Sequence, residues 1–183
     1  VDGVQYQILG DMQLPSKPIA AVGEEGPVNC LYTFETPGAG WNQEKFETTN
    51  GKTGKLPFGK GWDNDFATAW DTKEIWVRRT FNYDGASIDY LLAKLRYDED
   101  VEVYLNGNKI YSCGNCYVTS VKTYPLEEAI KKYLKNGENI LAMHCINTQG
   151  YAWLDAGLYA QKKFNNIQLA KQESVTVTAT KTS

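Results

Sequence analysis

Apolar and polar side chains alternate along several short stretches of the chain. Residues 75–81 (IWVRRTF) place every second side chain on the same side, which separates Arg78 from Arg79. The tail at 174–180 (SVTVTAT) alternates in the same way, and we expect a strand there that pairs beyond Ser183. Residues 138–146 are almost continuously apolar instead, which is typical of a strand buried on both faces.

A β-hairpin is predicted at residues 101–112. Asn106-Gly107 separates two extended segments, and both residues tolerate the positive φ angles of a type I′ turn, whose twist matches the flanking strands. Further extended segments are expected at 1–10, 30–35, 90–97 and 150–159.

One short helix is predicted in this otherwise β-rich pattern. Pro125 suits its first position, apolar residues repeat at helical spacing from Leu126 to Leu134, and Gly137 suits its end. Residues 37–65 are rich in Gly, Asn and Trp and are expected to form loops, which often carry binding residues. Many short strands with one short helix indicate an all-β fold, an antiparallel β-sandwich.

Charge and hydropathy exclude two classes of partner. The formal net charge is −3 and the basic residues are scattered, whereas nucleic-acid binding needs a concentrated positive face. No apolar run approaches the length of a membrane span. The chain begins at Val1 without an initiating Met, so we expect a processed or excised fragment of a larger protein.

Four cysteines are present: Cys30, Cys113, Cys116 and Cys145. Cys113 and Cys116 have the spacing of a redox motif, but such a motif needs a helix N-terminus, and here the pair follows a strand. A four-cysteine zinc site normally uses two close pairs, and only one exists. A loop disulfide in an exported protein and a set of buried free thiols both fit the pattern.

Candidate catalytic groups have simpler structural interpretations. A glycosidase needs two carboxylates on either side of one bond. The acidic candidates are Asp63, Asp65, Asp71, Asp98, Glu99, Asp100 and Asp155, and most fall in turn-like segments. The single histidine, His144, lies within the apolar strand and is expected to be a packed, hydrogen-bonded core residue. An ion pair between Asp155 and Arg78 or Arg79 is expected to be structural.

A carbohydrate site would combine an aromatic face with polar side chains that bind hydroxyl groups. The aromatic candidates are Trp41, Trp62, Trp70, Tyr151 and Trp153, and the polar candidates are Asn147, Gln149 and Asp155. The sequence itself calls for no cofactor.

Three segments in order resemble a known family. IWVRRTF (75–81), VEVYLNG (101–107) and LKNGENILA (134–142) are similar to segments of the sugar-binding jelly-roll domain of family 2 glycoside hydrolases, over about residues 74–159. The resemblance implies the galactose-binding-like fold, and in the resembled enzymes catalysis belongs to a separate barrel. Modules of this fold often hold a structural calcium ion, for which the resemblance makes Asp63, Asn64 and Asp65 the candidate oxygen ligands.

The two chain ends resemble a second family. Residues 1–10 (VDGVQYQILG) and 170–182 (AKQESVTVTATKT) are similar to neighbouring segments of glutaminase A-like proteins of Bacteroidetes and fungi, as are 55–59 and 153–158 in part. The resemblance implies export to the periplasm or cell surface and a catalytic region beyond Ser183. It implies three parts: an N-terminal arm (1–29), a galactose-binding-like sandwich (30–165), and a C-terminal strand leading into the parent protein (166–183).

These observations predict a non-catalytic accessory module of a larger exported protein, glutaminase-like or glycan-processing. Its partners would be the catalytic region of the same chain and, in a binding role, carbohydrate. Scaffolding is favoured over carbohydrate binding, because a domain tied to its parent at both ends has an adequate role in burying an interdomain face. A stand-alone carbohydrate-binding module and a hydrolase domain are the alternatives.

Overall fold

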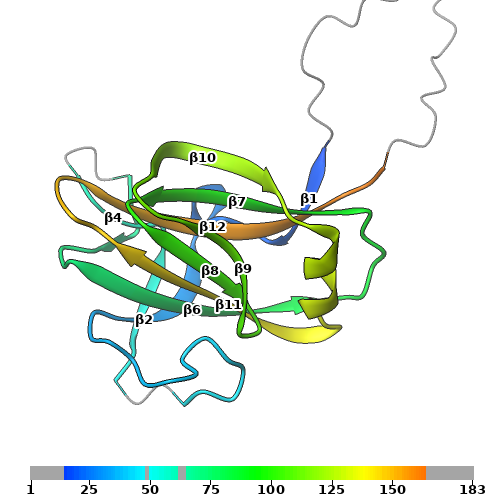
Figure 1. Ribbon diagram of the computed structural model, residues 1–183, viewed down its shortest axis with the longest axis horizontal. Coiled ribbons are helices and arrows are strands. Elements are labelled where there is room, and N and C mark those ends of the chain that lie inside the picture. Colours follow the sequence, from blue (N-terminus) through cyan, green and yellow to red (C-terminus); the bar gives the residue numbers. More distant parts are fainter. Residues whose placement is uncertain (1–14, 48–49, 62–64, 164–183) are drawn as a thin grey trace, which may run out of the picture.

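Two six-stranded sheets form the fold of the residues that the computed structural model describes, which are 15–47, 50–61 and 65–163 (Figure 1). Sheet A contains β1 (Ser16–Ala20), β4 (Phe58–Lys60), β5 (Thr68–Ala69), β7 (Tyr90–Asp98), β10 (Tyr117–Pro125) and β12 (Ala152–Gln161). Sheet B contains β2 (Val28–Thr33), β3 (Lys52–Leu56), β6 (Glu74–Tyr83), β8 (Val101–Leu105), β9 (Asn108–Cys113) and β11 (Gly137–Ile146). The predicted β-sandwich is confirmed.

The strand order places β12 and β11 near the centres of their sheets. Sheet A runs β10-β7-β12-β4-β5, with β1 also paired to β12, and sheet B runs β3-β2-β6-β11-β8-β9. Every pairing is antiparallel except the short one between β4 and β5. Ser16 pairs with Gln161, so the two ends of the described chain lie side by side at one end of the sandwich (Figure 1).

The core lies between the sheets and explains the hydrophobic pattern. β11 pairs with β6 on one side and β8 on the other, and both of its faces are largely covered, as its continuous apolar sequence predicts. β6 alternates as expected, with Ile75 and Val77 pointing into the core. The largest fully buried side chains are Trp70, Tyr97, Tyr159, Phe58, Leu56, Ile75, Leu91, Leu95, Leu105, Leu141, Met143 and Leu154.

The hairpin of β8 and β9 is confirmed at its turn. Asn106 and Gly107 both have positive φ angles, of 49° and 83°. The Asn106 side chain also donates to the Tyr133 carbonyl and accepts from the Ile140 amide, so it links the turn to β11.

The predicted helix is present only as a short 3₁₀ helix, η2 (Glu128–Tyr133). Pro125 does not begin it but ends β10, where it pairs with Leu92 of β7. The apolar residues in and beside η2 pack on the core from one end of the sandwich, and a short 3₁₀ helix is sufficient for this contact. Among the described residues, no helix has the length and hydrophobicity needed to cross a membrane.

Five of the described strands were not predicted: β1, β3, β4, β5 and β10. β3 and β4 fall within residues 37–65, where loops were expected. β3 and β10 are edge strands with mostly exposed or half-buried side chains, so neither has a strong apolar alternation. β1 lies in the segment assigned to the N-terminal arm. The expected strands at 1–10 and 174–180 lie outside the described residues.

The cysteines divide into one bonded pair and two thiols. Cys113 and Cys116 form a disulfide, which is one of the two states that the sequence allowed. Cys30 and Cys145 are buried free thiols on the inner face of sheet B. Burial raises the pKa of the Cys30 thiol to about 12, and it raises the pKa of Cys145 further.

We therefore expect neither free thiol to react while the protein is folded, because the thiolate is the reactive form. Without reductant, Ellman's reagent should detect no rapidly reacting thiol in the native protein and two after unfolding in guanidinium chloride. A thiol that reacts within minutes in the native protein would contradict the buried placement.

Candidate functional site

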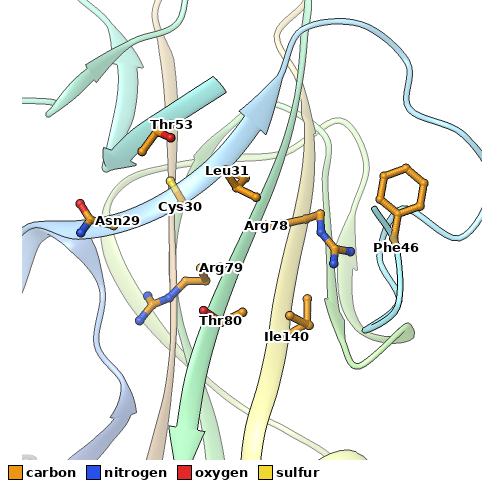
Figure 2. A pocket seen from close by; sticks show the side chains of 9 residues that line it. All are labelled: Asn29, Cys30, Leu31, Phe46, Thr53, Arg78, Arg79, Thr80 and Ile140. Atoms are coloured by element: carbon orange, nitrogen blue, oxygen red, sulfur yellow. The ribbon is translucent and has the colours of Figure 1, made fainter. Parts of the chain in front are cut away.

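A groove of about 360 Å³ lies on the outer face of sheet B, beside the segment that follows β2 (Figure 2). Strand register builds its floor. Leu31 of β2 pairs with Thr53 of β3 and Arg78 of β6, and Thr80 of β6 pairs with Ile140 of β11. The lining residues are Asn29, Cys30, Leu31, Phe46, Thr53, Arg78, Arg79, Thr80 and Ile140.

Arg78 holds the segment 34–47 against the sheet. Its guanidinium donates hydrogen bonds to the backbone carbonyls of Trp41 and Gln43, the latter at 2.8 Å, and lies 5.5 Å from the centre of the Phe46 ring. Trp41 packs edge-on against Tyr104 of β8, with the ring centres 5.7 Å apart. The segment therefore forms one wall of the groove, with Phe46 as its aromatic part (Figure 2).

The Arg78 guanidinium keeps some donor capacity. Burial lowers its pKa, but an arginine stays charged in proteins. Both described hydrogen bonds use Nη1, and neither Nε nor Nη2 is among the buried polar atoms without a partner in the described residues. These two nitrogens therefore stay open to solvent or to a ligand.

Arg78→Ala is expected to release the segment 34–47 from sheet B, because two hydrogen bonds from a charged donor are lost. We expect a loss of about 1 to 3 kcal/mol in the free energy of unfolding. Trypsin should cleave after the exposed Lys45 at least tenfold faster than in the unmodified protein. The control is Lys122→Ala on the exposed edge of β10, and equal cleavage rates in both variants would contradict the anchoring role.

His144 was expected in the core between the sheets, but it lies on the outer face of sheet B. Its neighbour Cys145 occupies the inner face because successive strand residues alternate. The imidazole stacks on Trp76 with ring centres 4.5 Å apart, and its Nε2 lies 3.0 Å from Glu74 Oε2. It is hydrogen-bonded as predicted, but to a carboxylate on the adjacent strand.

The candidate ligand residues do not gather in one place. Trp41 is half-buried beside sheet B, whereas Trp70 is fully buried in the core. Tyr151 is exposed before β12, and Asn147 is half-buried, with its backbone N–H donating to the Lys73 carbonyl. Trp62 lies outside the described residues.

Trp153 and Asp155 are buried on the outer face of sheet A. The Arg96 guanidinium covers the Trp153 ring at 3.9 Å. Asp155 accepts hydrogen bonds from the Gly23 and Glu24 amides, at 2.8 and 2.9 Å, and so fixes the 3₁₀ turn η1 (Gly23–Glu25). These contacts are structural.

The predicted ion pair between Asp155 and Arg78 or Arg79 is not formed, because both guanidinium groups donate to backbone carbonyls and Asp155 accepts from backbone amides. The Arg79 guanidinium donates to the Ala21 and Ala156 carbonyls, at 2.6 and 3.4 Å. Burial raises the pKa of Asp155 to about 6, against the amide hydrogen bonds and the Arg79 charge, which lower it.

The candidate calcium ligands are only partly described. Asp65 accepts a hydrogen bond from Arg96 at 2.8 Å, while Asp63 and Asn64 lie outside the described residues. Within the described part of the chain, no cluster of three or more His, Cys, Asp or Glu side chains has the arrangement of a metal site.

The sequence pattern does not predict the groove, because the residues that line it are far apart in the sequence. Leu31 and Ile140 fit ordinary strand patterns, and Phe46 is one aromatic residue in a long segment expected to form loops. Arg78 was recognised as opposite to Arg79, and Figure 2 confirms that the two side chains diverge. The pairings of β2 with β6 and of β6 with β11 bring the strand residues of the groove together.

No protein-family model and no curated protein matches the sequence. The structure resembles parts of solved glycosidases. A β-glucuronidase 2 from Bacteroides uniformis superposes with a TM-score of 0.57 at 15% identity, covering 81% of this chain and 18% of that chain. A β-glycosidase from Bacteroides vulgatus gives 0.51 at 15% identity, with 78% and 20% covered. A β-glucuronidase from glycoside hydrolase family 2 gives 0.51 at 15% identity, with 79% and 15% covered.

At 15% sequence identity, the likeness to these three enzymes shows a similar fold only. This chain spans a fifth or less of each of these three enzymes, so the likeness concerns one part of each of their chains. The described residues thus form a β-sandwich whose fold is similar to a part of these solved glycosidases.

Proposed function

We propose that the chain is a non-catalytic accessory domain of a larger, exported glycan-processing protein. The observation that carries this proposal is the likeness to a small part of several glycosidases, each of which has most of its chain elsewhere. Fold alone does not establish activity, so the proposal also depends on the chemistry of the described side chains.

The described carboxylates support a non-catalytic role. Hydrolysis of a glycosidic bond needs two carboxyl groups facing a shared substrate site. The groove is lined by no carboxylate. Glu24 and Asp65 both bind Arg96, Glu102 binds Tyr104, and Asp155 binds backbone amides. Such partners hold these groups in structural positions.

Scaffolding of a catalytic region in the same parent chain is the first form of this role. It is supported by the dispersal of the predicted aromatic ligand residues, since a sugar-binding surface needs several of them together. Carbohydrate binding is the second form, and the groove beside Phe46 and Leu31 favours it. We also propose a periplasmic or cell-surface location, which the disulfide supports because such bonds persist in oxidising compartments.

The chemistry of the parent is proposed to be glycosidase-like. The solved structures favour this assignment. A glutaminase-like parent is the alternative, and it depends mainly on the chain ends at 1–10 and 170–182, which lie outside the described residues.

The test is a turnover assay on the full 183-residue chain. We expect no hydrolysis of chromogenic β-glucuronides, β-galactosides or a glutaminyl anilide at micromolar protein. Release of product in proportion to the chain, retained through a second chromatographic step, would overturn the proposal. A glycan array then separates the two forms, because scaffolding predicts no bound glycan.

A further inference from the structure

The charged side chains that line the groove on sheet B are cationic. Arg78 and Arg79 are its charged lining residues, and only Arg78 points along the outer face (Figure 2). Lys55 does not line the groove but adds a second cation to that face, because it pairs with the lining residue Asn29 and alternates with the buried Leu56. No described residue forms an ion pair with Lys55. On the same face of β11, Glu138 lies beyond Ile140 and outside the lining.

The remaining lining side chains are of two kinds. Leu31, Ile140 and Phe46 supply apolar surface, and Leu31 is 42% exposed although it is a large hydrophobic residue. Asn29, Thr53 and Thr80 supply an amide and two hydroxyl groups from adjacent strands. Apolar surface with a few polar groups is the usual composition of a small-molecule site, and the volume is suitable for one or two sugar rings.

We propose that this groove binds a glycan through a sugar residue that carries a carboxylate. The carboxylate lies between Arg78 and Lys55, and one face of the ring lies on Leu31 and Phe46. The free Nε and Nη2 donors of Arg78 supply charge-assisted hydrogen bonds. The proposal rests on the carbohydrate-binding form of the function above and adds the chemical class of the ligand.

Charge decides between ligand classes. A neutral sugar would use the apolar floor and the hydroxyl groups but would leave two cations without an anion. A sugar with a carboxylate satisfies both parts of the groove. An extended acidic peptide shares the charge, and the experiment below tests whether it competes for the groove.

The experiment compares two trisaccharides by calorimetric titration of the full chain. One consists of galacturonic acid residues and the other of galactose residues, so the pair differs in the carboxylate at C6. We expect the acidic trisaccharide to bind at least tenfold more tightly, and its affinity to fall several-fold between 50 and 300 mM salt because charges are screened. Sodium acetate at the same carboxylate concentration should not displace it.

Surface variants locate the site without disturbing the core. Lys55→Gln should weaken the acidic trisaccharide about fivefold, and Phe46→Ala about tenfold, which corresponds to 1.4 kcal/mol. The matched controls are Lys122→Gln and Tyr117→Ala on β10, at the edge of sheet A, where Tyr117 is 64% exposed. Both controls should retain full affinity.

Each other outcome overturns the proposal in a distinct way. Equal affinity for the two trisaccharides removes the charge requirement, and loss of binding in the controls places the site elsewhere. Displacement by acetate or by an acidic peptide makes the groove a general anion or peptide site. Absence of binding leaves the scaffolding role intact, whereas turnover of a glycoside contradicts the accessory function itself.

Discussion

Arg79→Ala is expected to lower the free energy of unfolding by about 3 to 5 kcal/mol, because it removes a buried charge and the partner of two carbonyls. Arg79 is 6% exposed and reaches from sheet B to the Ala21 and Ala156 carbonyls. It therefore connects β6 with the segment after β1 and with β12. Its loss also removes a positive charge that lowers the pKa of the buried Asp155.

Urea unfolding followed by tryptophan fluorescence measures this loss. Lys122→Ala on exposed β10 is the control and should change stability by less than about 0.5 kcal/mol. Arg79→Met restores part of the volume without the charge and separates packing from hydrogen bonding. A loss below about 1 kcal/mol for Arg79→Ala would show that the bridge between the sheets contributes little.

Asp155→Ala is the second large effect, with an expected loss of about 2 to 4 kcal/mol near pH 5. The variant leaves the Gly23 and Glu24 amides without their acceptor in a buried position. If Asp155 were instead a ligand residue, as the sequence suggested, its replacement would reduce binding and leave stability nearly unchanged.

The loss should depend on pH in a defined direction. Burial raises the pKa of Asp155 from 3.8 to about 6, so the folded protein binds this proton more tightly than the unfolded chain. The stabilisation is therefore complete below about pH 4 and declines as the pH rises through 6, by up to about 3 kcal/mol. The difference between the unmodified protein and the variant should shrink from pH 4 to pH 7.

Chemical unfolding at pH 4, 5, 6 and 7 measures this difference. Asp71→Ala is the matched control, because Asp71 is an exposed aspartate that pairs with Lys60 at the surface. A difference that grows with pH would mean that the amide hydrogen bonds and Arg79 outweigh burial and hold the pKa of Asp155 below its usual value.

The contacts of Asn106 and Asn139 explain what the family resemblance reflects. The segments at 75–81, 101–107 and 134–142 that resemble family 2 glycoside hydrolases are strands and turns of sheet B, and they include Asn106 and Asn139, which join the hairpin turn to β11. They are therefore signals of a fold, which agrees with the structural likeness at 15% identity. The outer face of the same sheet carries the groove.

Local sequence determined the elements with strong signals. The alternation at 75–81, the apolar run at 138–146 and the Asn106-Gly107 turn each depend on neighbouring residues, and each was predicted correctly. Edge strands β3 and β10 were missed, because half-exposed strands with polar sequences have no hydrophobic period.

Tertiary structure alone decided which chemical groups meet. Arg78 and Arg79 are adjacent in sequence, yet one anchors a surface segment beside the groove and the other bridges the sheets through the core. Asp155 and Trp153 were expected to contact a ligand, and the segment after β1 and Arg96 cover them instead. The physical reason is that periodicity sets the face on which a side chain lies, whereas strand order and register set what lies opposite that face.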